Sequence, residues 1–174
     1  MSLLRFIAFA GAGWAIFVLL SALRPAAPLA APPKALLSEY GFFEGKMADL
    51  RPAAGVFPYE VNAPLFSDYA EKARFVYLPE GQKMGYQPAQ AFDFPTGAVI
   101  IKNFYYWNDA AHPEQGRRIL ETRLLLREER GWKALGYIWD EAQTDAALEV
   151  AGATFPLTWK DAAGKKQQLH YVVP

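Results

Sequence analysis

Short apolar segments separated by turn residues fill the second half of this sequence and most constrain its fold. The run AVIIKNFYYW (98–107) is largely apolar on both alternating faces, which is typical of a strand buried in the middle of a sheet. RILETRLLLR (118–127) and WKALGYIW (132–139) follow after short connections and predict an antiparallel meander. Further strands are expected at 75–78, 145–150, 154–159 and 168–173. We therefore predict a mainly β fold, an antiparallel sandwich or a partly closed barrel.

The segments before the strands predict little regular structure. Residues 35–43 (ALLSEYGFF) are apolar, with one or two helical turns that end at Gly41. Residues 49–64 hold three prolines and a glycine, which favours an irregular segment laid over the core. Ser67 is a residue type that caps helices, so a helical turn is expected at 68–72.

The N-terminus predicts export. A basic start is followed by an uncharged run from 6 to 23, the layout of a signal peptide, and the run is also just long enough to span a bilayer. Residues 1–23 are therefore either a signal peptide or a retained membrane anchor, and both alternatives stay open. Residues 24–33 (RPAAPLAAPP) predict a semi-rigid linker. A single β-rich domain is expected at 34–174, in the periplasm or cell envelope, with the membrane as a partner through residues 6–23 if they are not cleaved.

Composition excludes several kinds of site. The chain has 174 residues and no cysteine, so disulfides, Cys-based zinc sites and covalent attachment of a c-type haem are excluded within it. The formal net charge is +0, and no stretch concentrates Lys and Arg. Because binding to phosphate backbones needs clustered basic residues, we expect no nucleic-acid partner.

Several blocks of the sequence are distinctive: LSEYGFF (37–43), GVFPYEVNAPLFSDYAEKARFVYLPEG (55–81), FPTGAVIIKNFYY (94–106), RILETRLLLREERGWKALGYIWDEAQTDA (118–146) and LHYVVP (169–174). Together they resemble the N-terminal domain of a bacterial family of exported proteins. Its members are named as di-haem c-type cytochromes or as uncharacterised exported proteins. The resemblance covers most of residues 36–174 and implies a place in the periplasm or cell envelope.

This sequence departs from that family at its C-terminal end. The family's chains continue, soon after the place that matches 171–174, into a segment with a Cys-x-x-Cys-His haem-attachment signature. This sequence ends at Pro174 without a cysteine, so the resemblance gives it no haem; covalent haem c is implied only in a missing C-terminal region. We expect a fragment of a longer protein, the alternative being a form that lost its cytochrome part. A haem domain or a redox partner is the partner that the resemblance implies.

Two groups of charged residues are candidates for binding or ion pairing. Glu121 and Arg123 share one face of their strand, with Leu120, Thr122, Leu124 and Leu126 on the other. They form either a clamp for a carboxylate ligand or a structural ion pair, and we expect the structural pair, partly buried. Asp140, Glu141 and Asp145 could supply acid–base chemistry or oxygen ligands for calcium. Their positions in WDEAQTDA favour turn and strand-end roles instead.

The remaining candidates are aromatic, imidazole and hydroxyl groups. Tyr59, Phe66 and Tyr69 surround a proline turn and form a candidate aromatic surface for a glycan or peptide, or else pin a loop to the core. His170 could be a metal ligand, but no second histidine or cysteine lies near it in the sequence. His112 reads as a solvated loop residue. Ser67 and Asp68 lack the surrounding glycines of a nucleophile elbow.

The sequence thus leaves three functions open. The first is a non-enzymatic cell-envelope domain, the N-terminal module of a c-type cytochrome-like exported protein, accessory to electron transfer. The second is a periplasmic module that binds a glycan or peptide. The third is a hydrolase that uses Asp140, Glu141 or Glu121 as its carboxylates.

Overall fold

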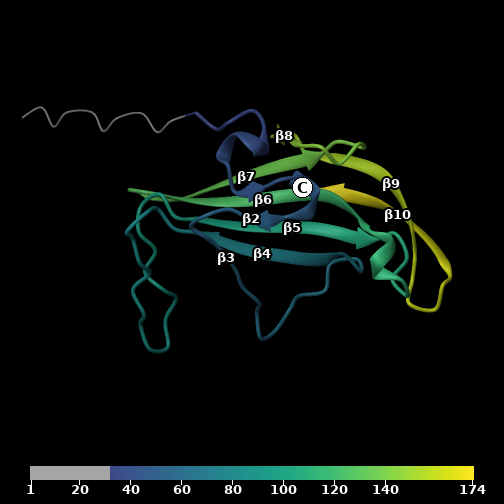
Figure 1. Cartoon of the computed structure of the whole chain (residues 1–174), viewed down its shortest axis with the longest axis horizontal. Coiled ribbons are helices and arrows are strands. Elements are labelled where there is room, and N and C mark those ends of the chain that lie inside the picture. The colour runs from purple at the N-terminus through teal and green to yellow at the C-terminus, as the bar shows by residue number, and fades with distance from the viewer. Residues whose placement is uncertain (1–31) are drawn as a thin grey trace, which may run out of the picture. The chain divides into compact units, whose positions relative to one another are not determined.

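The computed structural model describes residues 32–174 (Figure 1), and the predictions for residues 1–23 and for most of the linker lie outside that range. The predicted class is confirmed, because the described chain is mainly β and all its strand ladders are antiparallel. Within the described residues none of the three sheets closes on itself. Between residues 32 and 174 no helix has the length and apolar character needed to cross a bilayer.

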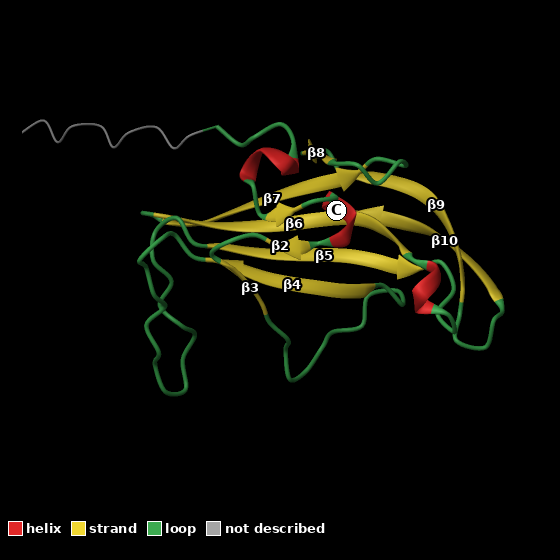
Figure 2. Ribbon diagram, viewed as in Figure 1, coloured by secondary structure: helices red, strands yellow, loops and turns green. Residues whose placement is uncertain are grey.

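A six-stranded sheet is the centre of the fold, with the order β3-β4-β5-β6-β7-β8 (Figures 1 and 2). Sequential strands are neighbours, so the sheet is a continuous meander, as the sequence predicts for its middle part. Its strands are β3 (Val56–Pro58), β4 (Glu71–Tyr77), β5 (Val99–Trp107), β6 (Arg117–Glu128), β7 (Gly131–Trp139) and β8 (Ala146–Glu149).

The N-terminal segment covers one face of this sheet. It contains two 3-10 helices, η1 (Leu37–Tyr40) and η2 (Met47–Asp49), and the two-stranded sheet of β1 (Phe43–Glu44) and β2 (Arg51–Pro52). The predicted helical turn is confirmed as η1, which ends at Gly41 in the left-handed conformation. The first core cluster joins Leu37 and Phe43 of this segment to Phe75, Ile101 and Tyr137 of the sheet. A third 3-10 helix, η3 (Pro113–Gln115), lies in the connection between β5 and β6.

A C-terminal hairpin packs against the opposite face. Its strands are β9 (Ala153–Lys160) and β10 (Lys166–Val173). The second core cluster joins Leu157, Trp159 and Tyr171 of the hairpin to Phe104 and Tyr106 of β5. The hairpin lies over one end of β5 and β6, and residues nearer the other end of these strands on the same face line a groove that is described below.

The local prediction for β6 needs a correction at Leu120. The β5–β6 register shifts between Phe104 and Tyr105, so that Phe104 pairs with Glu121 and Tyr105 with Ile119. This β-bulge turns Leu120 into the second core cluster, on the hairpin side, rather than toward Leu124 in the first. Simple alternation holds on either side of the bulge but not across it.

The side chain of Gln143 forms hydrogen bonds with the backbone of Ile119, beside the bulge. Its side-chain amide donates to the carbonyl of Ile119 at 3.0 Å and accepts from the amide of Ile119 at 2.6 Å. The residue itself has φ of 57°, and the same amide also donates to the carbonyl of Asp140 at 2.9 Å. Gln143 therefore takes the place of a neighbouring strand where β7 no longer reaches β6.

The helical turn expected at 68–72 is wrong. Asp68 and Tyr69 both have left-handed backbones, with φ of 47° and 64°, and the chain enters β4 at Glu71. The amide of Ala70 donates to the carbonyl of Ser67 at 2.8 Å, and the hydroxyl of Tyr106 donates to the carbonyl of Asp68. The hydroxyl of Ser67 therefore caps no helix, and a tight turn held by Tyr106 replaces it.

Candidate functional site

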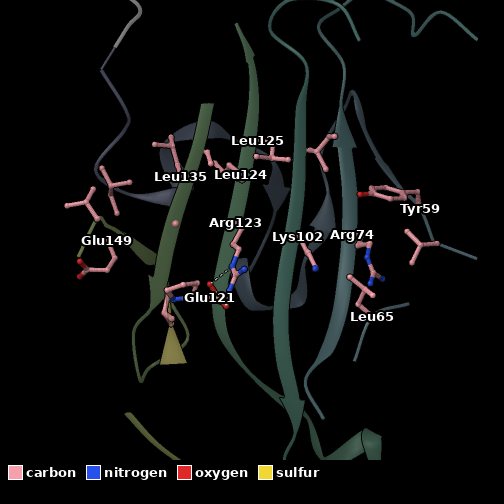
Figure 3. Close-up of a pocket in the computed structure, with 18 of the residues that line it drawn as sticks. Tyr59, Leu65, Arg74, Lys102, Glu121, Arg123, Leu124, Leu125, Leu135 and Glu149 are labelled. Carbon is pink, nitrogen blue, oxygen red and sulfur yellow. Dashed lines mark hydrogen bonds and ion pairs between the residues drawn. The ribbon is translucent and has the colours of Figure 1, made fainter. Parts of the chain in front are cut away.

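An open groove of about 740 Å³ lies beside the C-terminal hairpin, on the same face of the six-stranded sheet. Its floor consists of side chains from β5, β6 and β7, and residues 59–65 form one wall (Figure 3). Leu65 and Val150 on its rim are 79% and 88% exposed. A volume of this size suits one small molecule, since ligand pockets commonly measure about 300–1,000 Å³.

Three cationic side chains cross the floor of the groove in one row. In the strand register Arg74 of β4 is the partner of Lys102 on β5, and Lys102 is the partner of Arg123 on β6. Direct cross-strand partners point to the same face of a sheet, so the three charges are neighbours (Figure 3). Like charges in such positions repel one another, which makes this cationic row destabilising unless anions compensate it.

A buried carboxylate compensates one end of the row. Glu121 is 0% exposed, and Arg123 holds both its oxygens, through Nε at 2.8 Å and Nη2 at 2.7 Å. The hydroxyl of Tyr171, on the hairpin, donates to Oε1 of Glu121 at 2.7 Å. The hydrogen bond to Glu121 raises the pKa of Arg123, and burial followed by the hydrogen bond to Glu121 raises that of Tyr171. The geometry is thus that of a structural ion pair with its guanidinium turned partly to the groove.

Lys102 has no such compensation. Among residues 32–174 no carboxylate oxygen lies within 4 Å of its Nζ, which sits 4.5 Å from the centre of the Phe104 ring. The guanidinium of Arg123 lies 4.6 Å from the same ring. Burial lowers the pKa of Lys102, the charges of Arg74, Arg123 and Lys72 lower it further, and the charge of Glu121 opposes them in part. The middle of the cationic row is therefore a half-buried ammonium between two guanidiniums.

Arg74 at the other end has a distant, solvated partner. Only 8% of its side chain is exposed, and its nearest carboxylate is Glu60 at 3.6 Å, which is 85% exposed. Tyr59 lies beside it in the wall, where burial raises the pKa of the phenol. Because Glu60 is exposed, solvent weakens this pair, but its carboxylate still balances the charge of Arg74.

Aliphatic side chains continue from the cationic row along the strands. Leu125 on β6 is the cross-strand partner of Ile100 on β5 and of Ala134 on β7. These three residues lie two positions along their strands from Lys102, Arg123 and Gly136. Ile100 and Leu125 also line a second groove of about 420 Å³. Its other walls come from the loop before β5, from β6 and from β7, and consist of Ala91, Phe92, Asp93, Phe94, Arg127 and Trp132. The two grooves therefore form one apolar path that begins at the charges.

The second group of predicted charged residues lies elsewhere. Asp140 closes a turn by accepting hydrogen bonds from the backbone and hydroxyl of Thr144. Hydrogen bonds from Thr144 lower the pKa of Asp140. Asp145 accepts from the amide of Ser38 at 3.0 Å and from its hydroxyl, which ties η1 to the start of β8. Glu141 is exposed. These residues do not line the groove with Glu121, so the expected turn and strand-end roles fit Asp140 and Asp145.

The candidate aromatic surface divides into two places. Tyr59 lines the groove, whereas Phe66 and Tyr69 contact each other edge to face at 5.0 Å and are each 71% exposed. Phe66 and Tyr69 border a smaller hollow of about 380 Å³, together with Asp68, Trp159, Asp161, Gln167, Gln168 and Leu169. This hollow combines aromatic rings with carboxylate and amide groups.

The remaining candidates do not assemble into a centre. His170 is exposed on β10 opposite Pro156, and His112 lies 3.3 Å from Glu114 in the β5–β6 connection. In the described part of the chain no three histidine, aspartate or glutamate side chains group closely enough to hold a metal ion. Asp68 contributes its carbonyl to Tyr106 in the turn that follows Ser67.

Sequence reasoning found Glu121 and Arg123 but missed Arg74 and Lys102. A lone Arg in ARFVY and a lone Lys in IIKNF give no signal by themselves. Their alignment depends on the register between β4 and β5, which are joined by residues 78–98. A long connection leaves that register undetermined, because only short hairpin loops fix it.

Comparisons of this chain with protein-family models, curated proteins and solved structures found no match. The groove and its cationic row are accordingly interpreted from their own geometry.

Proposed function

We propose that this chain is a non-enzymatic ligand-binding module of the cell envelope, with the groove beside the hairpin as its binding site. The observation that carries the proposal is the row of Arg74, Lys102 and Arg123 on the floor of an open groove whose other lining residues are mainly aliphatic. A soluble fold normally covers such a face or pairs its charges. Apolar walls with a few convergent polar groups are instead typical of small-molecule sites.

The carboxylates of the chain support a non-catalytic role. Acid–base catalysis needs a group that reaches the substrate and exchanges protons near neutral pH. Glu121 is buried and held by Arg123 and Tyr171, while Asp140 and Asp145 each accept backbone hydrogen bonds. Among residues 32–174 the only other carboxylate in the groove for the hydrolase alternative is Glu149, which accepts from the amide of Ala151 at 2.7 Å.

The cellular setting follows from the sequence. The uncharged run at 6–23 supports export, with or without cleavage, and the family resemblance supports a place as the N-terminal module of a cytochrome-like protein, accessory to electron transfer. In this proposal residues 1–174 carry no covalent haem, since they contain no cysteine. The hairpin packs on part of one face of the six-stranded sheet, which supports a sandwich-like arrangement in which the rest of that face is open.

The binding site is tested by photolabelling the full chain in envelope membranes. The probe is a neutral decanol that carries a diazirine and an alkyne, and mass spectrometry maps the labelled peptides. We expect labelling of the peptides from β5, β6 and β7 that line the groove. The variant Gly136→Leu should abolish it, because a Cβ at Gly136 fits without strain, 3.6 Å from the nearest atom, and the added side chain fills the groove.

The control variant for this experiment is Ala162→Leu. It adds the same bulk at an exposed turn residue that lines none of the three hollows. Its groove labelling should equal that of the unchanged chain. Groove peptides that remain unlabelled in the unchanged chain, or that label equally in Gly136→Leu, would refute the binding site.

The setting is tested separately by fractionation. The chain is expressed with its own N-terminus in a bacterial host that matures c-type cytochromes. We expect it in the periplasmic or membrane fraction without a covalent haem band. Recovery from the cytoplasm, or a haem band that resists denaturation, would contradict the proposal.

A second candidate function is glycan binding at Phe66 and Tyr69. Two exposed rings beside Asp161 and Gln167 combine a stacking platform with hydrogen-bonding groups. The left-handed backbones of Asp68 and Tyr69 add strain of the kind found at functional sites. Retention on a peptidoglycan or polysaccharide column that is lost in Tyr69→Ala, and kept in Gly136→Leu, would establish this function in place of the groove.

A further inference from the structure

We propose that the ligand of the groove is a single-chain apolar molecule with a carboxylate at one end, bound with the carboxylate on Lys102 and the chain along β5, β6 and β7. This inference rests on the proposed function and assigns its ligand class. Three features of the site carry it: the net charge of the row, the direction of the apolar path and the kind of wall.

The net positive charge of the cationic row, counted with its carboxylate partners, is balanced by one negative charge on the ligand. Arg123 is neutralised by Glu121 at 2.7 Å, and Arg74 has Glu60 at 3.6 Å. Lys102 is left with one uncompensated positive charge between them. A carboxylate carries a single charge at neutral pH, whereas a phosphate monoester carries about −1.5 to −2. A carboxylate over Lys102 therefore balances the row without introducing an excess of negative charge.

The apolar path gives the ligand its length and direction. It passes from Lys102 over Ile100 and Leu125 into the second groove. The walls there are mainly aromatic, and the lining residues besides Ile100 and Leu125 are Ala91, Phe92, Asp93, Phe94, Arg127 and Trp132. Arg123 in the first groove and Arg127 in the second are four residues apart on β6, which corresponds to about 13–14 Å. A medium-length alkyl chain fits that distance. The row of three cations lies at the hairpin end of the path, whereas the far groove holds one cation, Arg127, beside the carboxylate of Asp93 as a further lining residue, which favours the head at the hairpin end.

The walls favour an alkyl chain over a peptide. Extended peptides are usually recognised along the free edge of a sheet, where backbone groups are unpaired. The path runs instead over β5, β6 and β7, whose backbones are paired on both sides. A peptide there would lose the hydration of its amides without replacing it, whereas an alkyl chain loses only apolar hydration.

The inference is tested with four photoreactive probes of equal chain length: decanoate, decanol, decyl phosphate and decyltrimethylammonium, each with the same diazirine and alkyne. The readout is the probe concentration that half-labels the groove peptides of the full chain in envelope membranes. We expect decanoate to half-label at about tenfold lower concentration than decanol, since one charge-assisted hydrogen bond contributes at least that ratio. The ammonium probe should label least.

Lys102→Met removes the charge and keeps an apolar side chain of similar length. In this variant decanoate should lose its advantage, while decanol should label as before. The matched control is Lys133→Met on β7, which is the cross-strand partner of Leu126, lies outside the groove and should leave every ratio unchanged.

Each remaining outcome overturns the inference in a distinguishable way. Equal labelling by all probes would leave an apolar groove without head-group selectivity, so that the proposed function stands and the carboxylate assignment falls. A preference for decyl phosphate would assign a phosphate head. Absence of groove labelling by every probe would refute both the binding site and its ligand.

Discussion

Tyr171 on the C-terminal hairpin donates its hydroxyl hydrogen to Oε1 of Glu121 on β6 across 2.7 Å. The two residues are 50 positions apart, and Glu121 is fully buried. This hydrogen bond joins the two layers at the point where the β-bulge turns Leu120 and Glu121 toward the hairpin. The same carboxylate holds Arg123, so the structural contact between layers and the cationic row share one residue.

Tyr171→Phe should loosen the hairpin more than the rest of the fold. The change leaves Glu121 with one donor fewer in a buried place, and hydrogen bonds to charged groups contribute about 1.5–3 kcal/mol. We expect a loss of that size in the free energy of unfolding from denaturant titration, and faster amide exchange in β9 and β10. Tyr69→Phe, at a hydroxyl that is exposed, should change stability by less than about 0.5 kcal/mol. Equal losses for the two variants would argue against a coupling through Glu121.

Arg123→Ala should destabilise the chain through Glu121. Breaking a fully buried pair costs about 3–5 kcal/mol, and the 41% exposure of the guanidinium reduces our expectation to about 2–3 kcal/mol. Glu121→Gln in the same background should recover much of the loss, because the amide needs no counterion. Denaturant unfolding of both single variants and the double variant measures this coupling.

The control for that cycle is Arg127→Ala. Arg127 lies on the same strand and face, but within residues 32–174 it forms no ion pair; its Nε donates to the carbonyl of Phe94 at 3.4 Å, and its guanidinium lies 5.7 Å from the centre of the Trp132 ring. A loss of about 0.5–1 kcal/mol is expected. Additive effects of Arg123→Ala and Glu121→Gln would show that the two side chains contribute independently, contrary to the geometry.

Part of this arrangement is predictable from the sequence and part is not. The apolar run at 98–107 predicts a central strand, and β5 spans Val99–Trp107 as the third of six strands. Alternation also places Glu121 and Arg123 on one face correctly. It fails at Leu120 because a bulge inserts a residue without changing the composition of the strand.

The cationic row is beyond sequence reasoning for a different reason. It depends on the pairing of Arg74 with Lys102 and of Lys102 with Arg123, and each pairing is set by packing and loop geometry. The left-handed turn at Asp68 and Tyr69 is equally hidden, because neither residue is a glycine and the turn is held by Tyr106 from β5. Long-range contacts decide both features.

Thr122→Val should show how much buried polar groups contribute to the stability of the six-stranded sheet. The hydroxyl of Thr122 donates to Oδ1 of Asn103 at 2.6 Å and accepts from Nε1 of Trp139 at 2.8 Å. Valine has the same shape but leaves both partners unsatisfied in the core, which costs about 1–3 kcal/mol for each group. We expect a total loss of about 2–4 kcal/mol in denaturant unfolding. Thr122→Ser keeps the hydroxyl and should lose about 1 kcal/mol for the missing methyl; a larger loss for serine would point to packing instead.

Lys102 should make the stability of the ligand-free chain depend on alkaline pH. Burial and the charges of Arg74 and Arg123 lower its pKa in the folded chain below the ordinary value of 10.5. The folded state therefore binds a proton here less tightly than the unfolded state does, and stability rises as pH increases from the folded pKa toward 10.5. Below the folded pKa the destabilisation is fully present, and above 10.5 it vanishes.

Lys102→Met isolates this effect, because every other group titrates in both chains. We expect the variant to unfold at higher denaturant concentration than the unchanged chain at pH 7, and the difference between them to shrink as pH rises toward 10.5. Lys133→Met, which breaks a pair with Glu128 at 3.8 Å, should instead lose about 0–1 kcal/mol at pH 7. A loss of stability in Lys102→Met at pH 7, or a difference that stays constant up to pH 10.5, would show that the ammonium is compensated in the free protein. Lys102 would then not be the uncompensated charge on which a carboxylate ligand is proposed to bind.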